Sequence, residues 1–199
     1  MQLPLLADRL GDLALELTDP KLNESRRVAA GDALLNEFHT GQFKFDELAM
    51  LSDSLALGMK LLKNLKRYPP RPNDFNFRDP ALDRLAKVQS AIGECLEKMS
   101  WRTTTQDETD LVNELLDQQG FNESFGAACE LYRQYQLDQL VEQTEMLAVN
   151  MQNIAEAGDD MISGQTIKLD IPLYLLAQFF RAVGWRLEQL VEFSLPPLN

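Results

Sequence analysis

Apolar residues recur along most of this chain at the three- and four-residue spacing that places them on one face of a helix. Near the N-terminus this spacing gives a single stripe, formed by Leu6, Leu10, Leu13 and Leu17. Asp19-Pro20 then ends the first predicted helix, because proline lacks the backbone N–H that a helix interior needs. The same pattern predicts further helices over about 23–38, 46–67, 80–99, 106–119, 122–157 and 171–193. We therefore predict an all-α bundle of six or seven helices.

Capping residues and prolines mark most of the predicted helix boundaries. The second helix is expected to begin near Asn23 or Ser25 and to end at Thr40-Gly41. Asp46 is the predicted N-cap of the third helix, because its side chain can accept a hydrogen bond from a free N–H of the first turn. Asp79-Pro80 combines an N-cap with a proline at the first helical position. These signals predict long helices joined by short connections.

Two loops interrupt the helical pattern. The first, 68–80, is rich in proline and cannot continue a helix. The second is predicted over 158–170, before Pro172 opens the last helix. Because 199 residues fit one ordinary domain, we predict a single helical domain over 1–199 that includes both loops.

The last predicted helix, 171–193, is the most apolar, and we expect it to be the central hydrophobic helix of the bundle. The 122–157 helix should pack against it. Its apolar stripe changes direction partway, so this helix either changes partners or breaks near Gln134. Several isolated glycines lie inside helical patterns, where each costs up to ~1 kcal/mol relative to alanine. We expect most of them to mark close helix–helix contacts: Gly11, Gly31, Gly58, Gly93, Gly126 and Gly184.

The chain is acidic, with a formal net charge of −12 over 199 residues, and its charge is segregated. Residues 60–102 carry ten basic and five acidic groups, whereas residues 103–161 carry thirteen acidic groups and one basic group. Such segregation creates regions of positive and negative electrostatic potential on the surface, and these regions steer charged partners.

The sequence contains none of the familiar catalytic or metal-binding patterns. One histidine, His39, is too few for a two-histidine metal site, and its place before Gly41 is typical of a helix C-terminus. Cys95 and Cys129 lie among apolar neighbours and are expected to be buried free thiols. There is no phosphate-binding glycine loop and no nucleophile elbow. We therefore predict no enzyme activity, no catalytic residue, no cofactor and no metal.

The leading functional hypothesis is an interaction protein that docks a basic protein partner through an acidic surface, as an adaptor, an inhibitor or a toxin-neutralising protein does. The alternative is that the carboxylates of the acidic surface only make the protein soluble and bind no partner. The carboxylates of the candidate face are Asp107, Glu108, Asp110, Glu114, Asp117, Glu142 and Glu145.

Two other hypotheses are open. Basic groups interleaved with aromatic residues over 60–78 could bind nucleic acid or another polyanion, although the acidic chain makes nucleic acid a less expected partner than a protein. The candidates there are Lys60, Lys63, Lys66, Arg67, Arg71 and Arg78. The chain could instead have a pocket between helices, which would bind a small apolar ligand or form the active site of an unfamiliar helical enzyme. The aromatic residues that could line such a pocket are Phe125, Tyr132, Tyr135, Phe179, Phe180 and Trp185.

The N-terminal residues lack the basic and apolar regions of a signal peptide, and no run approaches the ~20 apolar residues of a membrane span. A cytoplasmic protein with no membrane partner is the expectation. The oligomeric state does not follow from the sequence.

Overall fold

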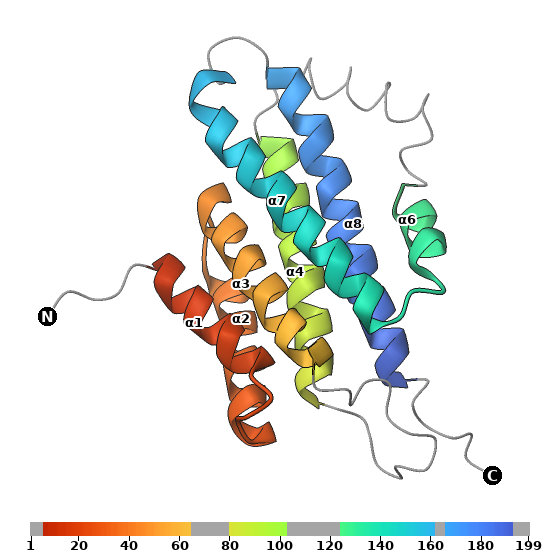
Figure 1. Ribbon diagram of the computed structural model, residues 1–199. Helices are drawn as coiled ribbons and strands as arrows, with labels where there is room; N and C mark the ends of the chain where they lie inside the picture. Colours follow the sequence, from red (N-terminus) through yellow and green to blue (C-terminus); the bar gives the residue numbers. More distant parts are fainter. Residues whose placement is uncertain (1–5, 65–79, 103–123, 162–165, 193–199) are drawn as a thin grey trace, which may run out of the picture.

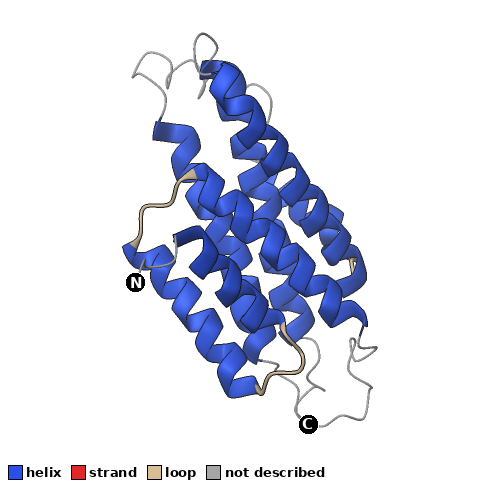
Figure 2. Cartoon of the chain, turned by 60° about the vertical axis from the view of Figure 1, so that its left-hand side comes forward, coloured by secondary structure: helices blue, strands red, loops and turns tan. Residues whose placement is uncertain are grey.

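The computed structural model describes residues 6–64, 80–102, 124–161 and 166–192. Almost all of them are helical, and none of these described residues forms a strand (Figure 2). The helices are α1 (Leu6–Thr18), α2 (Glu24–Thr40), α3 (Phe45–Asn64), α4 (Pro80–Arg102), α6 (Ser124–Tyr132), α7 (Leu137–Met161) and α8 (Thr166–Glu192). The predicted all-α bundle is confirmed.

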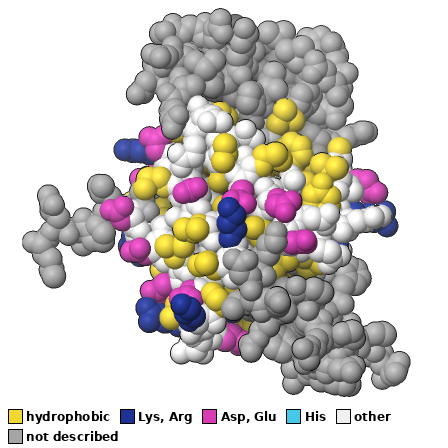
Figure 3. Space-filling view, in the orientation of Figure 1, with side chains coloured by type: hydrophobic (Ala, Val, Ile, Leu, Met, Phe, Trp, Pro, Cys, Tyr) yellow, Lys and Arg dark blue, Asp and Glu magenta, His cyan; other side chains and the backbone are white. Residues whose placement is uncertain are grey.

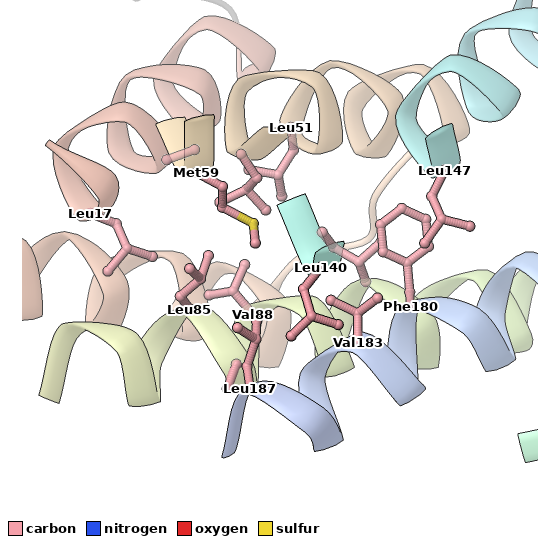
Figure 4. Close-up of a cluster of buried hydrophobic side chains, with 14 of the residues drawn as sticks. Leu17, Leu51, Met59, Leu85, Val88, Leu140, Leu147, Phe180, Val183 and Leu187 are labelled. Atoms are coloured by element: carbon pink, nitrogen blue, oxygen red, sulfur yellow. The ribbon is translucent and has the colours of Figure 1, made fainter. Parts of the chain in front are cut away.

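Six of the helices form a closed ring around one core. Following the ring, α1 packs on α2, α2 on α4, α4 on α8, α8 on α7, α7 on α3, and α3 on α1 again. The helix α6 lies outside this ring, against α8 (Figure 1). Side chains from α1, α3, α4, α7 and α8 point into the shared interior (Figure 4). The burial of this apolar interior is the main favourable term in folding.

The ends of α2 follow the sequence signals closely. The Asn23 side chain accepts a hydrogen bond from the Arg26 N–H at 2.9 Å, and the Gly41 N–H donates to the Glu37 carbonyl at 2.7 Å. The predicted cap of α3 was wrong. Lys44 is the residue before the helix, and its N–H donates to the Glu47 side chain at 2.8 Å, as in one half of a capping box. Asp46 lies within the first turn, where its negative charge still interacts favourably with the helix dipole and stabilises the helix.

The chain between α6 and α7 breaks where the sequence allowed a break near Gln134. Residues 133–136 form a turn, and the Tyr135 N–H donates to the Tyr132 carbonyl at 2.9 Å. The start of α7 has the same kind of cap as the start of α3: the Gln136 N–H donates to the Gln139 side chain at 2.9 Å, which is one of the two hydrogen bonds of a capping box. The two segments of the predicted 122–157 helix thus have different partners: α6 packs on α8, and α7 packs on α3 and α8.

Two other predictions need correction, and two more concern segments that lie outside the described residues. The loop predicted over 158–170 was wrong at both of its ends, since α7 continues to Met161 and α8 begins at Thr166, and its middle, 162–165, lies outside the described residues. Gly158 lies inside α7 at a cost of about 1 kcal/mol relative to alanine, and Pro172 lies inside α8 although a proline there removes one helical hydrogen bond. The fourth helix runs to Arg102 rather than to Met99. The predicted 106–119 helix and almost all of the 68–80 loop lie outside the described residues.

The helix α8 holds the central position that its composition predicts. Every side chain from Leu173 to Val191 is buried or half-buried. It crosses α4 at very short range through two glycines. A Cβ on Gly93 would lie 2.6 Å from the Ala177 carbonyl oxygen, and one on Gly184 would lie 2.6 Å from the Ala86 carbonyl oxygen. Close contacts also involve three of the other glycines, Gly11, Gly31 and Gly58, whereas Gly126 faces open space.

Tyr132 ties α6 to the rest of the bundle. Its ring is fully enclosed and lies 5.1 Å from the Tyr135 ring and 6.0 Å from the Phe179 ring. Its hydroxyl donates to Gln143 Oε1 at 3.1 Å. Burial in apolar surroundings raises the pKa of the Tyr132 phenol above its ordinary value, with a smaller contribution from Tyr135.

We expect this raised pKa to make the fold sensitive to alkali. The phenol is neutral in both folded and unfolded chains below pH ~10, so its contribution to stability is constant there. Above that value the unfolded chain loses the proton first, and stability falls as pH rises towards the folded pKa. In an alkaline titration, one of the four tyrosines should ionise only together with loss of the helical circular dichroism signal. Tyr132→Phe should abolish this late step, and Tyr135→Phe should leave it in place. A late step that survives in Tyr132→Phe would contradict the assignment.

Candidate protein-binding surface

Large apolar side chains are exposed on one side of the ring, where α1, α3 and α7 lie next to one another (Figure 1). Leu57 is 54% exposed and Val149 is 57% exposed, although both belong to long, well-packed helices. We call the outer side of these three helices the α1–α3–α7 face. Its exposed apolar residues are Leu15, Met50, Leu57, Leu61, Met146 and Val149.

The helical repeat explains why these residues share a side. On α3, Met50, Leu57 and Leu61 are spaced by seven and four residues, so they form one outward stripe. The helix α7 runs antiparallel to α3, because Ser52 Oγ contacts Met151 Sδ at 3.4 Å while Lys60 pairs with Glu145 further along. Leu57 and Met146 both lie between these two contacts. The apolar stripe of α3 therefore continues onto α7.

Carboxylates surround the apolar residues. On α1, Asp8 and Asp12 lie seven and three residues before Leu15, and all three are exposed. Asp53 lies between Met50 and Leu57 on the outer side of α3. Two more exposed carboxylates, Asp138 and Glu142, lie along α7 at four-residue spacing before Met146. In the space-filling view, apolar patches alternate with acidic side chains across this face (Figure 3).

One ion pair crosses the face. The Lys60 ammonium on α3 pairs with the Glu145 carboxylate on α7, and both side chains are partly exposed. A pair of this kind is worth only about 0–1 kcal/mol, so its main effect is on the local charge. The sequence assigns Lys60 to the polyanion-binding candidates and Glu145 to the acidic face. The structure joins them, and each neutralises the other.

The remaining predicted residues are only partly placed. Glu142 is exposed on α7, as a candidate for the acidic face should be. The other five acidic candidates lie outside the described residues: Asp107, Glu108, Asp110, Glu114 and Asp117. Among the basic candidates, Lys63 lies in the last turn of α3, and its side chain is outside the described part of the chain. Lys66, Arg67, Arg71 and Arg78 lie in segments that are not described.

The exposed apolar residues are the part of this site that sequence reasoning missed. The inward stripe of α3 explains residues such as Leu51 and Leu55, which are completely buried. Met50, Leu57 and Leu61 fall outside that stripe. Apolar residues left over after a helix has been assigned its core face are the signal that could have found them.

Five of the six aromatic residues predicted to line a ligand pocket pack in or against the core, and Trp185 is half-buried. Phe180 is completely buried, and the Tyr132 and Phe179 rings contact each other at 6.0 Å. Phe125 stacks under the Arg181 guanidinium, whose carbon lies 4.7 Å from the ring centre. Arg181 also pairs with Glu97 at 2.8 Å, which joins α8 to α4. These contacts hold α6, α8 and α4 together.

The single histidine and the two cysteines are the other residues that the sequence singles out for their chemistry. His39 Nδ1 donates to the Leu35 carbonyl at 2.6 Å in the last turn of α2, as predicted for a helix C-terminus. Neither Cys95 nor Cys129 forms a disulfide, and both are half-buried rather than fully buried. Burial raises the pKa of the Cys129 thiol, and the nearby Arg181 partly offsets this rise. Over the described ranges, no group of three or more His, Cys, Asp or Glu side chains could hold a metal ion.

None of the helices, as far as their residues are described, combines the length and the apolar character needed to cross a lipid bilayer. Comparisons of the chain with models of protein families, with curated proteins and with solved structures give no match.

Proposed function

We propose that this chain is a non-enzymatic interaction protein, which binds a basic protein partner through the α1–α3–α7 face and works in the cytoplasm. An adaptor, an inhibitor and a toxin-neutralising protein all fit this description. The observation that carries the proposal is the co-location of exposed apolar residues such as Leu57 and Met146 with unburied carboxylates such as Asp53. Scattered apolar residues are normal on a surface, but a group of them across neighbouring helices is typical of a binding site.

The two kinds of side chain have different tasks in such a site. The apolar residues supply affinity, because their removal from water is favourable by roughly 25 cal/mol for each Å² buried. Met50 and Met146 are unbranched and adapt to an irregular partner surface. The carboxylates select a partner of opposite charge and accelerate encounter, more than they add to affinity.

We expect truncation of the apolar residues to abolish partner capture. The test variant is Leu57→Ser with Met146→Ser, and the matched control is Leu131→Ser on α6, which lies outside the face. Leu131 is 55% exposed and Leu57 is 54% exposed, so the two substitutions have similar effects on solubility and stability. Native lysate should yield one or more basic proteins on the immobilised wild-type chain, and identical bands on the Leu131→Ser variant. The double variant should lose them.

The charge requirement is checked with salt and with a second pair of variants. Capture should weaken between about 50 mM and 500 mM salt, because ions screen exposed charges within a few ångströms at the higher value. Asp53→Lys should reduce capture. Glu94→Lys on α4, a helix that does not belong to this face, should leave it unchanged, and both residues are exposed acids. Capture that is indifferent to Leu57, Met146 and Asp53 would show that the α1–α3–α7 face is not the binding site.

A further inference from the structure

The shape of the α1–α3–α7 face restricts the kind of structure that can dock on it. We infer that the partner contributes a single basic amphipathic α-helix, which lies along the apolar stripe of α3 and contacts α7 with one edge. This inference rests on the proposed function and specifies the partner of the same face.

The length of the stripe matches a short helix. Met50 and Leu61 are eleven residues apart on α3, which corresponds to about 16 Å at the helical rise of 1.5 Å per residue. Leu57 lies between them, and Met146 and Val149 flank the stripe on α7. A partner helix of about three to four turns covers this distance, with apolar anchors at helical spacing.

A helix suits this face better than an extended strand. Strand addition needs a sheet edge with unpaired N–H and C=O groups, and no strand occurs in the described part of this chain. The groups that the face offers are side chains on helices, whose own backbone hydrogen bonds are already made. Side-chain packing of helix against helix is the contact that remains.

Charge decides the composition of the partner helix and argues against a second copy of this chain. The apolar stripe has carboxylates on both sides, Asp12 on α1 and Asp138 on α7, with Asp53 within it. Lysines or arginines that flank the apolar side of the partner helix would therefore meet negative charge on both edges. A second copy would bring the same carboxylates to this face, in a chain whose net charge is −12.

The probe for this inference is a synthetic peptide of leucine, lysine and alanine, about 18 residues long, with leucines on one helical face. One control peptide has the same composition with the leucines dispersed around the helix, and another has glutamate in place of lysine. The readout is the NMR spectrum of the full chain with 13C-labelled methionine methyl groups. Met50 and Met146 are about half exposed on the face, while Met59 and Met151 are completely buried and serve as internal references.

We expect the amphipathic basic peptide to shift the Met50 and Met146 signals in a saturable way and to leave Met59 and Met151 unchanged. Leu57→Ser with Met146→Ser should weaken binding at least tenfold, followed through the Met50 signal, and Leu131→Ser should change it less than twofold. Both control peptides should bind at least tenfold more weakly. Equal binding of the dispersed peptide, or shifts that spare Met50 and Met146, would overturn the inference.

Two further outcomes separate this inference from its alternatives. If the Met50 and Met146 signals move with protein concentration alone, the occupant of the face is a second copy, and the inference is wrong. If lysate proteins are captured in a Leu57-dependent way while the amphipathic peptide shifts neither methionine, the proposed function stands and the helical partner does not. If instead the capture of lysate proteins does not depend on Leu57, the proposed function itself is wrong.

Discussion

Replacing Phe180 with alanine is expected to lower the free energy of unfolding by about 3–5 kcal/mol, the range measured when a large aromatic side chain is removed from a core. Phe180 is completely buried on α8, the helix that has no exposed side chain between Leu173 and Val191. It points into the same interior as Leu140 and Leu147 of α7 (Figure 4). The alanine variant loses the transfer free energy of the ring and leaves a cavity that the surrounding helices can only partly fill.

Denaturant unfolding followed by circular dichroism measures this loss. Phe180→Leu keeps most of the volume and the apolar character, so we expect it to cost no more than about 1.5 kcal/mol. Leu57→Ala, on the exposed face, should stay within about 0.5 kcal/mol of the wild type. A cost for Phe180→Ala as small as that for Leu57→Ala would mean that α8 is not the centre of the bundle.

The helices themselves could be predicted from the sequence because their causes are local. Each of these signals depends on residues within one or two helical turns. Examples are the apolar stripe that ends at Leu17, the N-cap at Asn23 and the helix end at Gly41. The central place of α8 followed from the same evidence, because a helix that is apolar on most sides can only be stable inside the fold.

The errors have a common origin in the weight given to single residues. Asp46 is a good capping residue, yet Glu47 in the next position reaches back to the Lys44 N–H, and the cap of the helix lies two residues earlier than predicted. The break between α6 and α7 is comparable, because the sequence offered two possibilities and the Tyr132 contacts with Gln143 and Phe179 accompany the broken form. Intrinsic preferences are weak relative to such tertiary contacts.

The candidate site was only partly visible in the sequence, because exposure depends on which helices become neighbours. The carboxylates Glu142 and Glu145 could be listed from charge alone. That Glu145 pairs with Lys60, 85 positions earlier in the chain, required the antiparallel packing of α3 and α7. The same packing decides that Met151 is buried and Met146 exposed, although both are methionines on one helix.

The glycines at helix crossings allow a test in which the sign of the effect is predicted. In an exposed helix, glycine to alanine stabilises by up to about 1 kcal/mol, because alanine is the better helix former. We expect Gly184→Ala on α8 to destabilise the chain by about 2–3 kcal/mol instead, as overpacking of a tight core does. The added Cβ would lie 2.6 Å from the Ala86 carbonyl oxygen and 2.9 Å from the Ser90 backbone nitrogen, so α4 and α8 have to separate.

Gly126 is the matched control for this substitution, since it is a helical glycine on α6 with no atom within 4 Å of its would-be Cβ. Gly126→Ala should raise the free energy of unfolding by up to about 1 kcal/mol. The two variants add the same methyl group to the same secondary structure. The opposite signs of their changes in the free energy of unfolding therefore isolate the cost of separating the two helix backbones. If Gly184→Ala stabilises the chain as Gly126→Ala does, α4 and α8 do not meet at their backbones, and the closed ring of helices that presents the α1–α3–α7 face is wrong at its tightest crossing.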